Sequence, residues 1–170
     1  YPTVNYTSNE YIRDEFDPVY FQKRDDTMKE LEFSESADGY MADDGVAFVS
    51  DQAVMPSDQY SVVKRFKIGE MGRYRVYAPV TSNSATGFGN IIKVFKNDEE
   101  IWKQLIVPGK TNTLDIGVFA QKDDYIDVEV GVNEYAGFNR CEWTCDATKY
   151  MGKLFKTCDT SAGEKYTVQK

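Results

Sequence analysis

The segment from Asn133 to Asp146 brings aromatic, amide, acidic and basic side chains together within a short stretch of chain. Its aromatic rings belong to Tyr135, Phe138 and Trp143, and the tryptophan lies between two cysteines. An aromatic ring stacks on the apolar face of a pyranose, while polar side chains around it hydrogen-bond the sugar hydroxyls. Residues of these types at this spacing are therefore typical of a surface that binds a sugar.

Trp143 is the expected centre of such a surface. Its neighbours from Arg140 to Asp146 are mostly polar, so no apolar stripe requires the indole to be buried. An exposed tryptophan usually marks an interaction site, and stacking on it contributes on the order of 1–3 kcal/mol. The residues expected to complete this site are Tyr135, Phe138, Asn133, Asn139, Arg140, Glu142 and Asp146. For the two further rings, covering the end of the domain is an equally good interpretation, and for each polar residue so is ordinary loop polarity.

Three cysteines, Cys141, Cys145 and Cys158, lie in the last part of the chain. An odd number permits one disulfide and one free thiol, or no disulfide at all. A bridge between Cys141 and Cys145 would tighten the loop around Trp143, provided that a turn brings their Cα atoms within ~4.4–6.8 Å. Three unpaired thiols are the alternative, and the extracytoplasmic setting expected below favours the bridge.

The charge balance excludes several classes of partner. The chain has 28 acidic and 20 basic residues, a net charge of −8, and no cluster of lysine and arginine. Phosphate binding needs such a cluster, so we expect no nucleic-acid partner, and the acidity also disfavours anionic membrane surfaces. No apolar run approaches the ~20 residues of a membrane-spanning helix.

The chain contains no histidine. Ser-His-Asp and Cys-His catalysis are therefore excluded, and the commonest transition-metal ligand is missing. A small glycosidase would need only two carboxylates about 5–10 Å apart, but no cleft is indicated, so we expect no enzyme and no cofactor. Asp43-Asp44 and Asp123-Asp124 are compatible with a structural calcium ion, although such pairs are usually turns.

Short runs of β-branched and aromatic residues, separated by turn residues, account for most of the chain. They predict one hairpin from residues 60–68 and 73–77 and a second from residues 91–95 and 101–107. Eight or more such strands without a long helix predict an all-β fold, an antiparallel β-sandwich with jelly-roll-like topology.

Residues 27–170 are expected to form this sandwich, after a partly irregular leading segment at residues 1–26. Trp102 alternates with polar residues in a strand and is expected to pack in the core. Asp127 and Glu129 alternate with apolar residues and are expected to face solvent.

Several segments in the middle of the chain follow one another in a recognisable order. They are Asp44–Val46, Val62–Phe66, Gly72–Val76, Gly87–Asn90, Ile92–Asn97, Ile101–Trp102, Asp124–Val130 and Asn139–Asp146. This order resembles that of the jelly-roll carbohydrate-binding modules of secreted polysaccharide-degrading proteins of bacteria. The resemblance implies a domain without catalytic residues, in which the loop at residues 87–90 lies close to the loop at residues 133–146. Phe88, between two glycines, would then face the Trp143 loop as an opposite wall.

Together these observations predict a non-catalytic domain that binds a neutral polysaccharide. An α-glucan such as starch is favoured, because a compact site with one tryptophan suits a curved chain or a chain end. The alternative is a protein-interaction or structural module of a cell-surface or scaffold protein. We expect an extracellular or cell-surface location, and because the chain starts at Tyr1 rather than Met, we expect a piece of a larger multi-domain protein.

Overall fold

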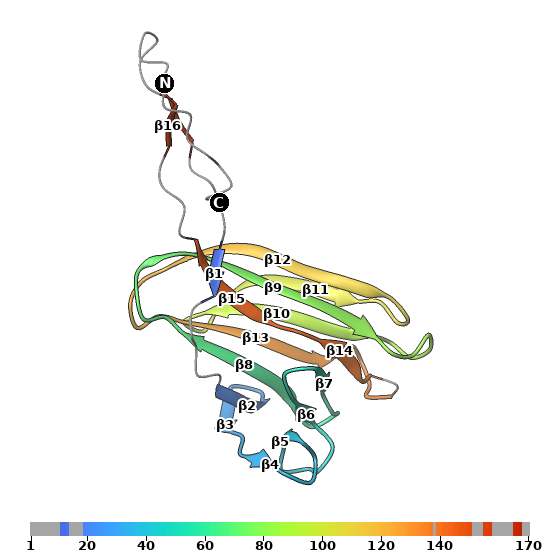
Figure 1. Ribbon diagram of the computed structural model, residues 1–170. Coiled ribbons are helices and arrows are strands. Elements are labelled where there is room, and N and C mark those ends of the chain that lie inside the picture. The colour runs from blue at the N-terminus through green and yellow to red at the C-terminus, as the bar shows by residue number, and fades with distance from the viewer. Residues whose placement is uncertain (1–10, 14–18, 138, 151–154, 158–164, 168–170) are drawn as a thin grey trace.

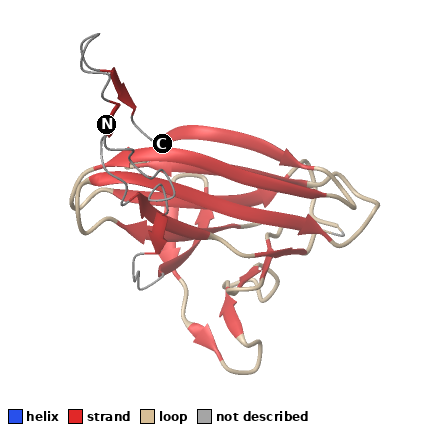
Figure 2. Cartoon of the chain, turned by 45° about the horizontal axis from the view of Figure 1, so that its top comes forward, coloured by secondary structure: helices blue, strands red, loops and turns tan. Residues whose placement is uncertain are grey.

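The computed structural model describes residues 11–13, 19–137, 139–150, 155–157 and 165–167. These residues form strands and loops (Figure 2), and none of them forms a helix long and apolar enough to span a membrane. Two large antiparallel sheets form the body of the molecule (Figure 1). The predicted all-β antiparallel sandwich is therefore confirmed.

The first sheet has nine strands, with β9 at its centre. Its members are β12 (Thr111–Ala120), β9 (Gly72–Ser82), β14 (Cys141–Trp143), β15 (Asp146–Tyr150), β1 (Tyr11–Arg13), β7 (Ala53–Met55), β6 (Phe48–Val49), β5 (Gly39–Met41) and β4 (Phe33–Ser34). One edge of β9 pairs with β12, while β14 and β15 pair with it at Val80–Ser82 and Tyr74–Tyr77. These two short strands therefore act as one interrupted strand.

The second sheet has six strands in the order β11-β10-β13-β8-β2-β3. They are β11 (Glu99–Ile106), β10 (Asn90–Lys96), β13 (Tyr125–Val132), β8 (Ser61–Lys67), β2 (Val19–Arg24) and β3 (Thr27–Glu30). A separate two-stranded sheet contains β16 (Phe155–Thr157) and β17 (Lys165–Thr167).

Most connections between β8 and β14 pass from one sheet to the other, as a jelly-roll-like topology requires. Within this stretch, the described strands β10 and β11 are the exception, because they form a hairpin in the six-stranded sheet, which confirms the second predicted hairpin. Its turn residues Asn97 and Asp98 both have positive φ, 48° and 70°, a pattern that favours tight hairpins.

The other predicted hairpin, between residues 60–68 and 73–77, is wrong. The two strands exist, but β8 pairs with β2 and β13 whereas β9 lies in the opposite sheet. Ile68 continues the pairing toward β13, because its N–H donates to Asp124 O and its carbonyl accepts from Asp123 N, each at 2.8 Å. The chain then crosses between the sheets, a choice that the short turn sequence does not reveal.

The core lies between the two sheets and follows the period-2 alternation of the strands. On β9, Tyr74, Val76, Ala78 and Val80 are fully buried, and on β13 the facing residues include Val128. Each polar residue between them turns to the outer face, so the strands bury one side each.

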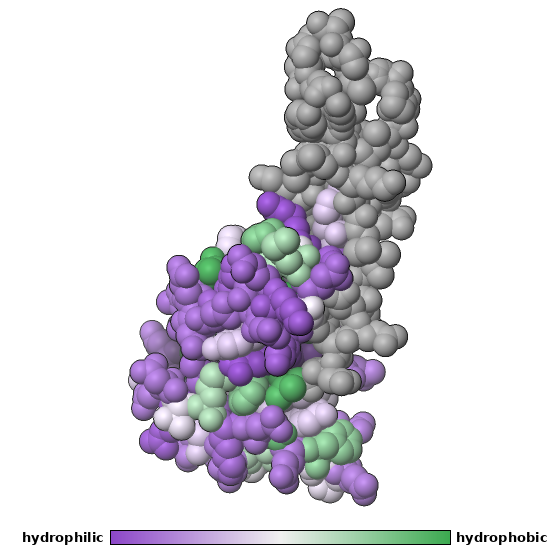
Figure 3. All heavy atoms as spheres, turned by 90° about the vertical axis from the view of Figure 1, so that its left-hand side faces the viewer, coloured by the Kyte–Doolittle hydropathy of each residue, from purple (hydrophilic) through white to green (hydrophobic). Residues whose placement is uncertain are grey.

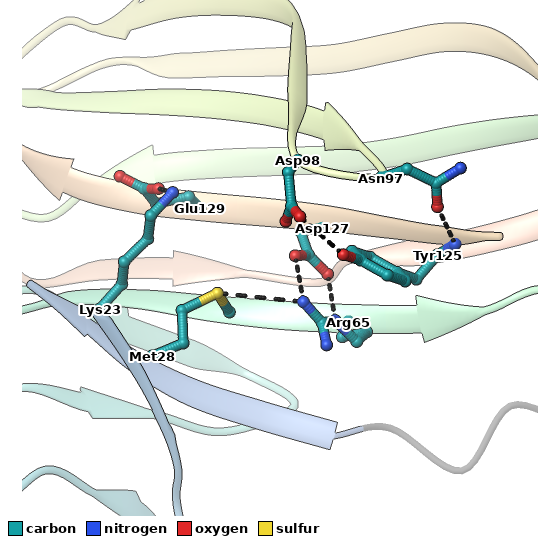
Figure 4. A network of polar contacts seen from close by, with 8 residues as sticks. All are labelled: Lys23, Met28, Arg65, Asn97, Asp98, Tyr125, Asp127 and Glu129. Atoms are coloured by element: carbon teal, nitrogen blue, oxygen red, sulfur yellow. Dashed lines mark hydrogen bonds and ion pairs between the residues drawn. The ribbon is translucent and has the colours of Figure 1, made fainter. Parts of the chain in front are cut away.

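The outer face of the six-stranded sheet carries buried ion pairs (Figure 4). The Arg65 guanidinium donates two hydrogen bonds of 2.7 and 2.8 Å to the Asp127 carboxylate, and Lys23 Nζ lies 2.8 Å from Glu129 Oε1. Asp127 and Glu129 thus point outward as expected, but they are buried rather than solvated. Long neighbouring side chains cover the two carboxylates. One of them is Arg65, whose guanidinium also lies over the ring of Tyr125, 3.9 Å from the ring centroid.

Strand β11 forms the outer edge of the six-stranded sheet and is mostly exposed. Trp102 is 42% exposed, so the expectation that it packs in the core is wrong. It pairs with the buried Val94 and shares its face, but none of the described strands pairs with the outer edge of β11.

Strands β1 and β2 lie within residues 1–26, the predicted leading segment. They nevertheless pair with β15 and β8, so this part of the chain contributes to both large sheets. The predicted boundary at residue 26 falls in the turn between β2 and β3.

Candidate functional site

The β7–β8, β9–β10 and β13–β14 loops meet at the end of the sandwich that lies at the right of Figure 1. The backbone N–H of Asn83 donates to Arg140 O at 3.3 Å, which joins the second loop to the third. The backbone N–H of Ala136 donates to the Asp58 carboxylate at 2.5 Å, which joins the third to the first. The loops at residues 87–90 and 133–146 are therefore close together, as the resemblance implied.

Phe88 and Tyr135 form the most exposed ring contact at this end of the molecule. Their side chains are 48% and 62% exposed, and their ring centroids lie 5.3 Å apart in an edge-to-face arrangement. Asn133 braces the contact, because its side-chain amide donates to Phe88 O at 2.8 Å and its backbone N–H donates to Gly89 O at 3.3 Å. We call these two rings the aromatic pair.

Trp143 does not lie at the surface, so the expectation of an exposed tryptophan is wrong. The residue is 4% exposed and belongs to the core cluster. Its indole N–H donates to Ser50 O and its backbone N–H donates to Gln52 O, each at 2.9 Å. The indole therefore holds the β6–β7 turn from behind and offers no face for stacking.

The burial of Trp143 follows from the strand that contains it. Cys141, Trp143 and Cys145 are buried while Glu142 and Thr144 are exposed, a strict period-2 alternation. Strand β14 pairs with both β7 and β9, so one of its faces must meet the core. The alternation was visible in the sequence, and it indicates a half-buried strand rather than a loop.

Cys141 and Cys145 are free thiols, so the expected bridge between them is also wrong. Four residues of extended chain separate them by about 13 Å, well beyond the Cα spacing that a disulfide allows. Burial raises the pKa of both thiols, to about 12 for Cys145. Cys158 lies outside the described residues.

Asn139 has a structural role. It is buried, its side-chain amide donates to Pro56 O, and its own carbonyl accepts from the Asn90 amide at 2.8 Å. Asp146 is half-buried at the start of β15. Phe138 lies outside the described residues.

Arg140 and Glu142 line a shallow groove on the outer face of the nine-stranded sheet. The groove has a volume of about 580 Å³, and it is also lined by Gln52, Ala53, Pro79, Thr81, Trp143 and Thr144. We call it the β14 groove. It begins where the loop bearing Tyr135 ends, so the predicted polar residues lie along the sheet rather than around an exposed indole.

A second, more enclosed hollow lies on the other side of Gln52. The sequence predicted no binding role for any of its residues. The hollow has a volume of about 260 Å³. Its principal lining residues are Tyr20, Phe33, Asp38, Tyr40, Asp51 and Gln52. We call it the Tyr20 pocket. Its residues come from four separate elements, so only the fold brings them together.

Three of the four aspartates considered for calcium accept hydrogen bonds from protein donors. Asp43 pairs with Lys29 at 2.9 Å, and Asp44 accepts from the backbone N–H groups of Val46 and Ala47. Asp124 accepts from the backbone N–H of Gln121 and from the side-chain amide of Asn97. Among the described residues, no group of three or more histidine, cysteine or acidic side chains is placed to hold a metal ion.

Figure 3 shows the end of the molecule that lies at the left of Figure 1. The surface of this end is mostly hydrophilic, and its apolar areas are separated by hydrophilic ones.

No protein-family model and no curated protein matches the chain. One solved structure that resembles it contains the CBM51-2 domain, in complex with GlcNAc, and the INT domains of Clostridium perfringens ZmpB. The two chains are 9% identical with a TM-score of 0.46, and the match covers 86% of this chain and 29% of that one. Another is the CBM51 of Clostridium perfringens GH95 in complex with methyl-galactose, with 8% identity, a TM-score of 0.44 and coverage of 86% and 99%. Pika GITRL is a further one, with 12% identity, a TM-score of 0.37 and coverage of 80% and 97%. Likenesses this weak carry no information about a ligand.

Proposed function

We propose that the protein is a non-catalytic carbohydrate-binding module that binds a neutral polysaccharide at the aromatic pair. The observation that carries this proposal is that Phe88 and Tyr135 hold two exposed rings in a fixed edge-to-face contact across two loops. Exposed rings of this kind stack on the apolar face of a sugar. Because three loops and Asn133 hold the pair in place, little conformational freedom is lost on binding.

The β14 groove supports the same proposal with hydrogen-bonding groups. Arg140 donates and Glu142 accepts, and both are exposed next to the loop that carries Tyr135. Sugar hydroxyls need donors and acceptors together. A chain that stacks on the aromatic pair would have its hydroxyls bound by this groove.

We propose an α-glucan such as starch as the first glycan to test. Two rings at one end of a sandwich make a compact site, which suits a curved chain or a chain end better than a flat strand. We further propose an extracellular or cell-surface setting and a larger parent protein, the setting in which a module that binds a polysaccharide would meet its ligand.

Affinity electrophoresis against soluble polysaccharides tests the proposal, with starch, a β-glucan and a mannan in the panel. Tyr135→Ala and Phe88→Ala are each expected to weaken retardation by about tenfold, since stacking on one ring contributes roughly 1–3 kcal/mol. Phe119→Ala is the matched control, because Phe119 is an equally exposed phenylalanine on β12, paired with Arg73 near the other end of β9. It is expected to behave like the unmodified protein.

Three outcomes would contradict the proposal. Retardation by no glycan in the panel, or equal retardation of the Tyr135→Ala and control variants, removes the sugar site. Release of reducing sugar from any of the glycans contradicts the non-catalytic part of the assignment.

A protein partner is the second candidate, and strand β11 is the observation that favours it. Ile101, Trp102 and Leu105 are all exposed on this edge strand. Exposed apolar side chains on a sheet edge are typical of interaction sites. Association that depends on Trp102 and not on Tyr135 would support this alternative.

A further inference from the structure

The Tyr20 pocket is built by elements remote from the aromatic pair. Its floor is Tyr20 of β2, one wall is the β4–β5 hairpin with Phe33 and Asp38, and the other wall is the β6–β7 turn with Asp51. At about 260 Å³ it has room for a small ligand only. Pockets for drug-sized ligands are larger, about 300–1,000 Å³.

Three aromatic residues that line this pocket contact one another through their rings. Tyr20 and Tyr40 have ring centroids 4.4 Å apart, and Tyr40 meets Phe33 edge-to-face at 5.5 Å. Phe33 is 54% exposed, although a residue of this kind gains by burial in the core. The ring is therefore positioned toward the pocket rather than into the interior.

All charged residues that line the pocket are acidic. Asp38 and Asp51 are exposed, and neither forms an ion pair with any residue that the structure describes. Lys64 lies 5.7 Å from the ring centroid of Tyr20, but its ammonium is buried in the core and donates to Cys145 O at 2.7 Å. No described cationic side chain therefore pairs with either carboxylate at the pocket.

Asp51 is fixed in place by its neighbours. The hydroxyl of Tyr20 donates to Asp51 Oδ1 at 3.0 Å. Burial and this hydrogen bond hold the pKa of Tyr20 above its ordinary value, so the phenol stays neutral and remains a donor. Trp143 holds Ser50 O and Gln52 O on either side, which fixes the backbone that carries the carboxylate.

We propose that the Tyr20 pocket binds a small ligand that carries a protonated amine, with an amino sugar unit as the ligand class. The ammonium would lie between the carboxylates of Asp51 and Asp38, against the faces of Phe33 and Tyr40. A cation is attracted both to carboxylates and to the faces of aromatic rings. The sugar ring would stack on Phe33, and its hydroxyls would meet the amide of Gln52.

This inference does not depend on the function proposed for the aromatic pair. The aromatic pair and the Tyr20 pocket have no residue in common, so each can fail without the other; only Gln52 lines both the pocket and the β14 groove. A variant of Tyr135 tests only the first site, and a variant of Asp51 tests only the second.

Titration of the full chain with D-glucosamine, followed by amide chemical shifts in NMR, tests the pocket. Shifts are expected at residues 38–40 and 50–52. D-glucose and N-acetyl-D-glucosamine have the same ring without the charge, and they are expected to bind at least about tenfold more weakly, as loss of one cation contact implies.

Substitutions separate the contributions of charge and ring. Asp51→Asn keeps the shape and removes one charge, and Phe33→Ala removes an exposed ring. Each is expected to weaken glucosamine binding by about tenfold. Glu99→Gln is the charge-matched control on the remote strand β11, and Tyr135→Ala is the control for the aromatic pair. Both are expected to leave glucosamine binding unchanged.

Equal binding of glucosamine and N-acetylglucosamine would overturn the proposal. So would unchanged glucosamine binding by Asp51→Asn and Phe33→Ala, or shifts confined to other parts of the chain. The comparison of glucosamine with N-acetylglucosamine can be read even if a variant folds poorly, because it uses the unmodified protein.

Discussion

At the scale of single residues, Trp143 has a structural role, because it is buried beneath the surface and holds the β6–β7 turn in place. Its indole and backbone N–H groups hold Ser50 and Gln52, and Gln52 separates the β14 groove from the Tyr20 pocket. Replacing a buried tryptophan by alanine typically costs about 3–5 kcal/mol. Loss of sugar binding in such a variant would therefore report unfolding or a displaced turn, and Tyr135 and Phe88 are the informative positions.

The cysteines offer a test of the same strand. With Cys158 replaced by alanine, only Cys141 and Cys145 remain. Both are buried and have a raised pKa, so we expect the folded protein to resist Ellman's reagent at pH 8, because the thiolate is the reactive form. In urea, two thiols should react without a reducing agent.

The number of thiols in urea decides between the alternatives. If none reacts until a reductant is added, a bridge between Cys141 and Cys145 exists and the extended geometry of β14 and β15 is incorrect. Rapid labelling of the folded protein would instead contradict the burial of the two side chains.

At the scale of elements, Gly89 sets the path of the β9–β10 loop that presents Phe88. Its φ is +80°, and a Cβ atom there would lie 2.3 Å from the carbonyl oxygen of Ile106. We expect Gly89→Ala to destabilise the fold by about 3 kcal/mol or more, since a left-handed conformation alone costs alanine about 1–2 kcal/mol. Urea unfolding measures this change.

Gly45 provides the control for backbone conformation. Its φ is +68°, but a Cβ atom there would meet nothing within 4 Å. Gly45→Ala should therefore cost only the conformational part, about 1–2 kcal/mol. Equal costs at the two glycines would mean that the contact with Ile106 O does not constrain the loop.

At the scale of the whole molecule, the acidic surface links stability to pH. A hydrogen bond from Lys29 holds the pKa of Asp43 below its ordinary value, and one from Arg75 does the same for Asp115. Near pH 4 the unfolded chain therefore binds more protons at these sites than the folded chain. We expect the Tm to be highest above about pH 5 and to fall as the pH is lowered toward 3.

Two variants connect this fall to a particular pair. Asp115→Asn and Arg75→Gln each remove one partner of the ion pair, which measures 2.8 Å. Both are expected to flatten the curve of Tm against pH between pH 5 and 3. A curve for Asp115→Asn that keeps the slope of the unmodified protein would show that this carboxylate does not contribute to acid unfolding.

The molecule as a whole combines elements that the sequence located well and pairings that it located badly. The strands around Tyr74 and around Val128 were predicted because alternation along one strand is a local property. The supposed hairpin through Gly69–Gly72 failed because the partner of β8 is β13, which lies far along the chain. Strand pairing depends on contacts between distant segments, and these contacts cannot be predicted from the sequence of a turn.

The amino-acid sequence by itself determined an all-β chain, a surface without basic clusters, and the rings of Phe88 and Tyr135 in loops. Only the tertiary structure decided which rings are exposed, because burial depends on what lies across each strand. β7 and β9 flank β14, and the β6–β7 turn, which accepts from the indole N–H, closes over Trp143. In the part of the chain that the structure describes, no strand pairs with the outer edge of β11 beside Trp102. The Tyr20 pocket belongs wholly to the tertiary structure, since its residues share no local pattern and meet only when the elements pack.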